Sequence, residues 1–160
     1  MPDAPPLLSV NPETGPDWSA LLTLLQICFA FRDGRIDPPS SLHRLNADGL
    51  QAKAEREDLF VITQGTDLIA CMFGRPKDTH YYIGKLAVSP AHRGSGLATL
   101  LIEAAALRAE QLALKGLELE TRIELTENHA TFAALGFHVY EATAHPGFAR
   151  PTSFTFRRSL

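Results

Sequence analysis

Cysteine is scarce in this chain of 160 residues. The two that occur, Cys28 and Cys71, each lie within an apolar run. That setting is typical of buried, reduced thiols rather than of a disulfide framework or a reactive nucleophile. We therefore expect a reducing compartment and a cytoplasmic protein.

An excess of positive charge is also lacking. Fifteen Lys and Arg residues stand against 18 Asp and Glu residues, which gives a formal net charge of -3. Proteins that bind nucleic acid or anionic membranes carry a cationic surface, and this composition offers none. The predicted partners therefore include neither nucleic acid nor membrane.

Long hydrophobic runs and metal-binding patterns are missing as well. The best apolar run, Leu21 to Ala30, is interrupted by Thr23 and Gln26, and the N-terminal segment has no basic stretch before its apolar residues. We expect neither a signal peptide nor a membrane span. Among six histidines, no pair has metal-ligand spacing on a clear helix face, so we expect no metal.

The composition is sufficient for a hydrophobic core, since 45% of the residues are hydrophobic, and the length predicts a single domain over residues 1–160. Apolar periodicity predicts helices over 17–31, 47–56, 97 to about 115, and 127–135. Alternation and turn residues predict strands over 59–64, 68–75, 80–88, 117–125, 137–142 and 153–159. Gly116 is interpreted as the stop of the third helix.

The order of these segments predicts the topology. A long helix connects the strand at 80–88 to the strand at 117–125, and such a crossover is what parallel pairing requires. Short connections elsewhere favour antiparallel neighbours. The predicted fold is α/β: a mixed, mainly antiparallel sheet with one parallel strand pair and helices on both faces.

The segment "KLAVSPAHRGSGLATLL", residues 85–101, contains the most informative motif. The chain leaves a strand, crosses Arg93 and starts a helix at Gly94 and Gly96. The first N–H groups of a helix have no intrahelical partner and lie at the positive end of its dipole, so this loop is suited to bind an anion. Glycines let a diphosphate approach the backbone closely.

Three interpretations of this loop compete. A dinucleotide fold would need a third glycine where Thr99 stands, and here the stretch from Ser89 to Arg93 separates strand from glycine. A nucleotide P-loop needs Gly-Lys-Ser/Thr, which is absent. A helix that simply begins at glycines, without binding anything, remains open.

The segment "LAVSPAHRGSGLATLLIEAA" resembles the acetyl-CoA motif of the GNAT superfamily of N-acetyltransferases, Arg/Gln-x-x-Gly-x-Gly/Ala, here at Arg93, Gly96 and Ala98. The order of elements along nearly the whole chain is similar too, including Asn128, Phe132 and the late "LGF". The resemblance implies an acetyl-CoA-dependent N-acetyltransferase. Acetyl-CoA would be the co-substrate, and a primary amine of a small molecule or peptide would attack directly in a ternary complex. The alternative is a non-catalytic CoA-binding or regulatory module of the same fold.

The resemblance also implies which residues contact the cofactor. Val88 would bond the pantetheine arm, and the N–H of Leu86 would face the thioester oxygen as an oxyanion donor. Asn128 would lie beside the cofactor at the start of the next helix, although an ordinary capping role is an equal alternative. The main-chain amides that would hold the diphosphate belong to Arg93, Gly94, Ser95, Gly96, Leu97 and Ala98.

The catalytic groups depart from the family pattern. Tyr82 stands where many members have a carboxylate, and a phenol with a pKa of about 10 is a poor base. Glu120 is the candidate base, acting through water, or else an ordinary exposed strand carboxylate. Phe132 stands where many members have a tyrosine that protonates the thiolate, and Tyr140 is a candidate substitute.

The acceptor is expected between the loops at 32–41 and 144–151. Their charges, at Asp33, Arg35, Asp37 and Arg150, have no dominant sign and do not identify the amine. Strand edges in a short domain make a homodimer reasonable.

Overall fold

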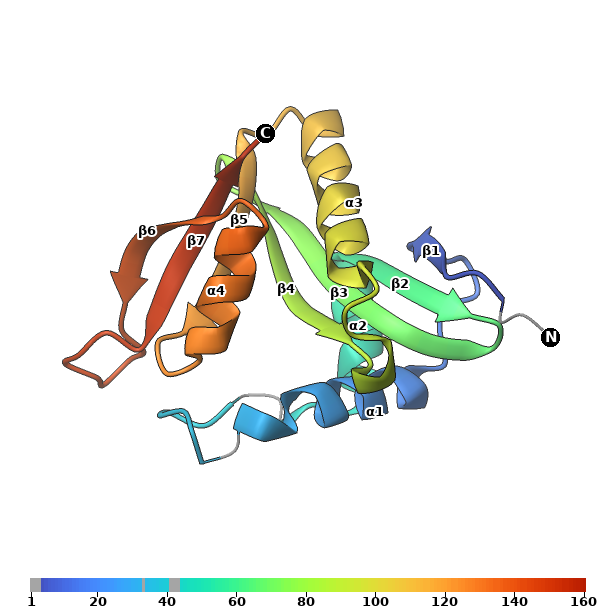
Figure 1. The fold of residues 1–160 in the computed structure, drawn as a ribbon, viewed down its shortest axis with the longest axis horizontal. Coiled ribbons are helices and arrows are strands. Elements are labelled where there is room, and N and C mark those ends of the chain that lie inside the picture. The colour runs from blue at the N-terminus through green and yellow to red at the C-terminus, as the bar shows by residue number, and fades with distance from the viewer. Residues whose placement is uncertain (1–3, 33, 41–43) are drawn as a thin grey trace.

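The computed structural model describes residues 4–32, 34–40 and 44–160 (Figure 1). In these ranges the strands are β1 (Leu7–Val10), β2 (Asp58–Gln64), β3 (Asp67–Lys77), β4 (His80–Val88), β5 (Gly116–Arg122), β6 (His138–Thr143) and β7 (Ser153–Ser159). The helices are α1 (Trp18–Phe29), α2 (Ala47–Arg56), α3 (Leu97–Gln111) and α4 (Thr126–Ala134). Short 3₁₀ turns cover Ala30–Arg32 and Pro90–His92.

All strands belong to one sheet in the order β1-β2-β3-β4-β5-β7-β6. Every neighbouring pair is antiparallel except β4 and β5, which α3 connects as a crossover. The predicted mixed sheet with one parallel pair is therefore confirmed.

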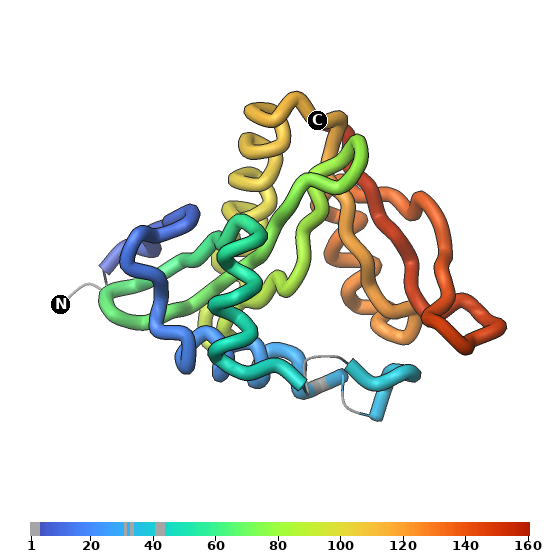
Figure 2. Tube along the Cα trace, turned by 180° about the vertical axis from the view of Figure 1, so that it is seen from behind, coloured from blue at the N-terminus to red at the C-terminus, as the bar shows by residue number. Residues whose placement is uncertain are grey.

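Each face of the sheet has its own core. On one face, α3 packs through Leu101, Ile102 and Ala105 against buried strand residues such as Tyr81 and Leu117. The opposite face carries α1 and α2, which are packed on the β2–β4 half of the sheet (Figure 2). Helices cover both faces, as predicted, but among the residues that the structure describes no helix covers β5, β7 and β6 on the α1/α2 face.

The predicted end of the third helix is wrong. Helix α3 ends at Gln111, where Ala113 adopts a left-handed backbone with φ 58° and the N–H of Leu114 returns to the oxygen of Ala109 at 2.9 Å. Gly116 is not a helix stop, because it already belongs to β5. A Cβ there would lie 2.3 Å from the main-chain oxygen of Arg158, so close strand packing requires the glycine.

Strands β4 and β5 pair only at one end. Their ladder joins His80, Tyr81 and Tyr82 to Gly116, Leu117 and Glu118, and the two strands then diverge (Figure 1). Along the other edge of β4, pairing with β3 is interrupted between Gly84 and Ala87 by a bulge in which Lys85 has φ 50°. Because β5 diverges from β4 beyond Tyr82 and Glu118, the second half of β4 has an unpaired edge inside the sheet, on the side that faces β5.

Within the described ranges, no helix combines the length and the apolar character needed to cross a membrane.

Candidate active site

The glycine loop connects β4 to α3 with a backbone that only glycine adopts easily. Gly94 and Gly96 have φ values of 81° and 84°, and a Cβ on either would meet no atom within 4 Å. Gly96 is the N-cap of α3 and provides no side-chain cap, so the first-turn N–H groups face open space. The geometry therefore fits a bound diphosphate.

The flanks of this loop are anchored. Leu97 is buried in the core on the α3 side, Ala98 is half-buried, and the hydroxyl of Ser95 donates to the oxygen of His92 at 2.5 Å. Arg93 is exposed, with its guanidinium beside the thiol of Cys28. The loop is thus fixed by the core contact of Leu97 and the Ser95–His92 hydrogen bond, while Gly94 to Gly96 stay exposed to solvent.

The open edge of β4 presents main-chain N–H groups. The N–H of Ser89 donates to the oxygen of Ile69 on β3 at 2.8 Å. Because N–H groups alternate along a strand, those of Val88 and Leu86 point to the opposite edge, where β5 has diverged. The structure thus brings Leu86, Val88 and the glycine loop together in one continuous edge.

Helix α4 lies on the same face of the sheet as α3 and flanks the opening from the β5 side (Figure 1). Asn128 is half-buried in the first turn of α4. One turn later Phe132 packs against Phe137 and Phe156, with ring centroids 6.0 and 6.3 Å away. Both predicted α4 residues thus belong to the helix beside the opening.

Tyr82 and the carboxylates of β5 lie on the other face. Register places Tyr82 beside Glu118, which is buried and paired with Lys77 at 3.3 Å and Arg157 at 2.9 Å. Burial, followed by the nearby charge of Glu120, raises the pKa of Tyr82, so its phenol stays protonated.

Glu120 is exposed and lies two residues beyond Glu118 on this face of β5. Within the part of the chain that the structure describes, its carboxylate has neither a hydrogen bond nor an ion pair. A carboxylate that has no partner among the described residues and lies next to the unpaired half of β4 is suited to act as a general base.

Tyr140 is not brought to the other candidates. It lies on β6, and both β5 and β7 separate that strand from β4. Its ring is 56% exposed and is covered by the guanidinium of Arg157 at 3.7 Å. The structure places this side chain at the outer edge of the sheet.

The two predicted acceptor loops are near each other at one end of the molecule (Figures 1 and 2). Arg150 pairs with Asp37 at 3.0 Å, and Arg35 pairs with Glu127 of α4 at 2.6 Å. Asp33 lies outside the described residues. Most of the loop charges that the sequence singles out are thus paired with each other or with α4.

Sequence reasoning missed two cations that face the α1/α2 side. Arg32 follows α1, and its guanidinium stacks over Phe29 at 4.2 Å. Burial, with Arg122 nearby, lowers the pKa of Arg32 to about 10. Lys85 lies in the β4 bulge, where burial, then Lys53 and Arg32, lower its pKa. No sequence pattern connects residues so far apart in the chain.

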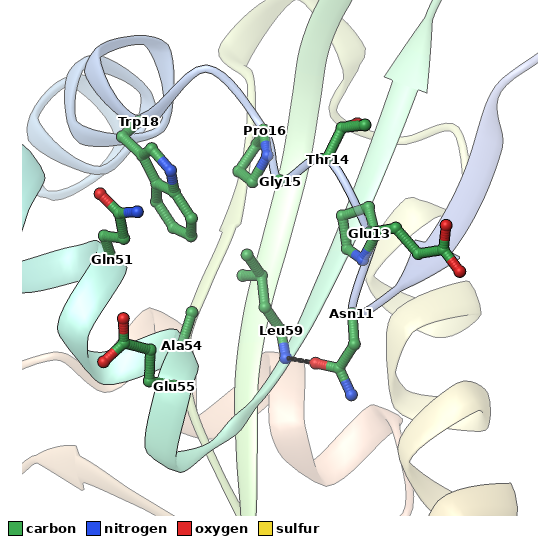
Figure 3. A pocket seen from close by; sticks show the side chains of 11 residues that line it. Asn11, Glu13, Thr14, Gly15, Pro16, Trp18, Gln51, Ala54, Glu55 and Leu59 are labelled. Atoms are coloured by element: carbon green, nitrogen blue, oxygen red, sulfur yellow. Dashed lines mark hydrogen bonds between the residues drawn. The ribbon is translucent and has the colours of Figure 1, made fainter.

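A separate cavity of about 270 Å³ lies between the segment after β1 and helix α2 (Figure 3). Its walls include Trp18 and Leu59, whose N–H donates to Asn11 at 2.8 Å. None of the residues predicted to bind cofactor or acceptor lines it. Its geometry adds nothing to the chemistry at the β4 edge.

Comparison with known families decides the assignment. Residues 18–137 match the model of the acetyltransferase (GNAT) family. The chain belongs to this family. It is therefore an acyltransferase, and the resemblance of the glycine loop is confirmed at the level of the family.

Solved GNAT structures share the fold across nearly the whole chain. An IAA acetyltransferase from Bacillus cereus has a TM-score of 0.66 and 16% identity, covering 98% of this chain and 100% of its own. The ribosomal-protein-S18-alanine N-acetyltransferase from Escherichia coli has a TM-score of 0.69 and 19% identity, with 97% and 94% covered. A GNAT acetyltransferase from Elizabethkingia anophelis with acetyl-CoA bound has a TM-score of 0.66 and 16% identity, with 97% and 98% covered. No protein of curated function matches the sequence significantly.

Proposed function

We propose that this protein transfers an acetyl group from acetyl-CoA to a primary amine, by direct attack within a ternary complex. The observation that carries the proposal is the continuous open edge from Leu86 through Val88 to Gly96, with left-handed glycines at the start of α3. The acetyl-CoA bound to the Elizabethkingia anophelis neighbour supports the choice of cofactor.

The cofactor would supply an activated acetyl thioester when bound. The main-chain N–H groups from Arg93 to Ala98 would hold its diphosphate, aided by the dipole of α3. Val88 would pair through its N–H with the pantetheine arm. The N–H of Leu86 would donate to the acetyl oxygen as negative charge develops there. Asn128 and Phe132 would line the α4 side.

Glu120 would take the proton from the attacking amine, directly or through water, because its carboxylate is exposed and unpaired within the described ranges. Tyr82 cannot serve as the base, since burial keeps its phenol protonated. It would instead donate a hydrogen bond to a water or to the acceptor.

The departing thiolate would leave without a protein general acid. Phe132 has no acidic proton, and Tyr140 is separated from β4 by two strands, so neither would protonate the thiolate. A thiol with a pKa near 8.5 is a tolerable leaving group without help.

A thiol-release assay tests this proposal. Purified protein is given acetyl-CoA and a panel of amino acids, polyamines and peptides, and free CoA is measured while calorimetry reports CoA binding. We expect tight CoA binding and steady thiol release with some of the amines. Tight CoA binding without turnover on any amine would favour a non-catalytic CoA-binding module, and absence of CoA binding would overturn both.

A further inference from the structure

We propose that the acceptor amine carries a carboxylate, as an amino acid does, and that Arg32 and Lys85 bind this carboxylate. The inference rests on the proposed acetyltransferase function and names the class of acceptor. The pairing of charges on the α1/α2 face of the β4–β5 region supports it.

Most charged groups on this side have a partner within the protein. Glu118 is paired with Lys77 and Arg157, and Lys53 is paired with Glu57 at 2.6 Å. The loop charges are paired through Arg35–Glu127 and Arg150–Asp37. Arg122 donates to the oxygen of Pro38 at 2.6 Å, and Arg75 stacks on Tyr82. Each of these groups thus already has a partner within the protein.

Arg32 and Lys85 differ from the paired cations. The Nε atom of Arg32 is buried and has no hydrogen-bond partner among the described residues, and its guanidinium stacks on the ring of Phe29. Lys85 has no acidic hydrogen-bonding partner among the described residues. A buried donor without an acceptor, as Arg32 Nε is, is costly, and a bound anion would offset that cost.

The two cations lie near the reaction centre. Lys85 immediately precedes Leu86, the proposed oxyanion donor, and it lies close enough to Arg32 for that charge to add to the effect of burial and lower the pKa of Lys85. Glu120 approaches from β5 on the same face. A molecule with an ammonium group at Glu120 and a carboxylate at Arg32 and Lys85 would therefore match the free charges of the site.

A carboxylate fits better than a phosphate. Arg32 ends the 3₁₀ turn Ala30–Arg32, which follows the C-terminal end of α1, where the helix dipole is negative and opposes a doubly charged anion. Phosphate sites draw on main-chain N–H groups at helix starts, which here belong to the glycine loop on the opposite side of β4. The guanidinium of Arg32 and the ammonium of Lys85 together supply enough hydrogen-bond donors to bind one carboxylate.

The test compares each amino acid with its own carboxamide, because the pair shares the amine and side chain and differs only in the carboxylate. O-phosphoethanolamine and putrescine complete the panel. We expect kcat/KM to favour the best amino acid over its carboxamide by about 10- to 100-fold, the range of a hydrogen-bonded charge. Equal rates for the pair, or a preference for putrescine or O-phosphoethanolamine, would overturn the inference while leaving acetyl transfer in place. Absence of thiol release from every amine would instead overturn the proposed function.

Two variants assign the preference to these residues. Lys85→Gln and Arg32→Gln should each reduce the ratio between acid and carboxamide by about tenfold, mainly through KM, with CoA binding retained. Arg56→Gln removes the same charge from an exposed position on α2 and should leave the ratio unchanged. Using two sites keeps the test decisive if one variant melts early. An unchanged ratio in a folded Lys85→Gln protein would overturn the assignment.

Discussion

The thiol of Cys28 donates a hydrogen bond to the main-chain oxygen of Val88 across 3.2 Å. This contact fixes the end of α1 against the open edge of β4. Of the two main-chain groups that Val88 directs to that edge, the oxygen is taken by Cys28, and the N–H is left for a ligand. Burial raises the pKa of the Cys28 thiol, and the charge of Arg93 in the glycine loop opposes that rise.

Gly96→Glu should abolish CoA binding. The new side chain would enter the open space above the loop and bring a negative charge against the diphosphate, at a residue whose φ of 84° already disfavours any side chain. Calorimetric titration of CoA into the folded variant measures the effect.

The matched control is Gly65→Glu in the turn between β2 and β3. Gly65 also has a positive φ, 62°, and equally open surroundings, so the backbone strain is comparable. We expect this variant to bind CoA normally. Wild-type affinity in Gly96→Glu would remove the glycine loop from the cofactor site.

Glu120→Gln should lower kcat by about 10²- to 10⁴-fold, the usual contribution of a general base, with little effect on CoA binding. Glu141→Gln, which changes another exposed strand carboxylate, is the control. If Glu120→Gln keeps the wild-type kcat, the base is another group.

Phe132→Tyr places a phenol in the position where many GNAT members carry one. General acid catalysis is worth at most about 10² to 10⁴ in rate. We expect only a modest rise in kcat with little change in KM for acetyl-CoA, because the thiolate already leaves tolerably well. The measurement is kcat against pH, alongside a melting curve, with Phe154→Tyr as the control.

The packing of Phe132 against Phe137 and Phe156 gives this experiment a second outcome. A phenol without a partner in that cluster would destabilise the fold by about 1 to 3 kcal/mol. An unchanged pH–rate profile combined with lost stability would mean that residue 132 serves the core, and the expected role beside the sulfur would be wrong.

Asp58 at the start of β2 joins three elements. It accepts hydrogen bonds from Tyr81 at 2.6 Å, Asn11 at 2.9 Å and Arg108 at 3.0 Å. Burial alone would raise the pKa of its carboxyl, but these donors outweigh it and lower the pKa below the ordinary value. The stabilisation is therefore present above the unfolded-state pKa and is lost as pH falls through the folded-state pKa.

Asp58→Asn should cost about 1 to 3 kcal/mol at neutral pH, because the amide NH₂ would face donors. The free energy of unfolding of the variant should also fall less than that of the wild type as the pH is lowered below about 5. Urea unfolding across that range, with the exposed Asp67→Asn as the control, measures both effects. If Asp58→Asn and the wild type lose the same free energy of unfolding at acid pH, the pH dependence comes from groups other than Asp58.

Local patterns were sufficient to predict most of the fold. Alternation and turns located β2 to β7, and Asp17 is the N-cap that the first helix was expected to have. Strand β1 was not predicted, because four residues at an edge carry little alternation. Strand β5 ends at Arg122 rather than at residue 125, since the chain turns there toward α4.

The candidate site could be predicted only where its residues are contiguous in the sequence. The loop from Arg93 to Ala98 and the edge at Leu86 and Val88 are encoded in one short segment. The bulge at Lys85 has no sequence pattern of its own, and the proximity of Arg32 to Lys85 depends on how α1 packs across β4. Tyr140 was misleading for the same reason, because strand order rather than sequence distance separates it from β4.

Unpaired strand edges usually invite aggregation, because any extended chain can extend the sheet there. In this protein the unpaired half of β4 lies in the middle of the sheet, between β3 and the diverging β5, with α3 and α4 on one face and α1 on the other (Figure 1). A neighbouring molecule can approach the outer edges at β1 and β6, but the inner edge is too enclosed for another sheet. Only a single narrow, extended ligand fits such an edge, so the divergence of two strands provides a hydrogen-bonding surface without exposing it to self-association.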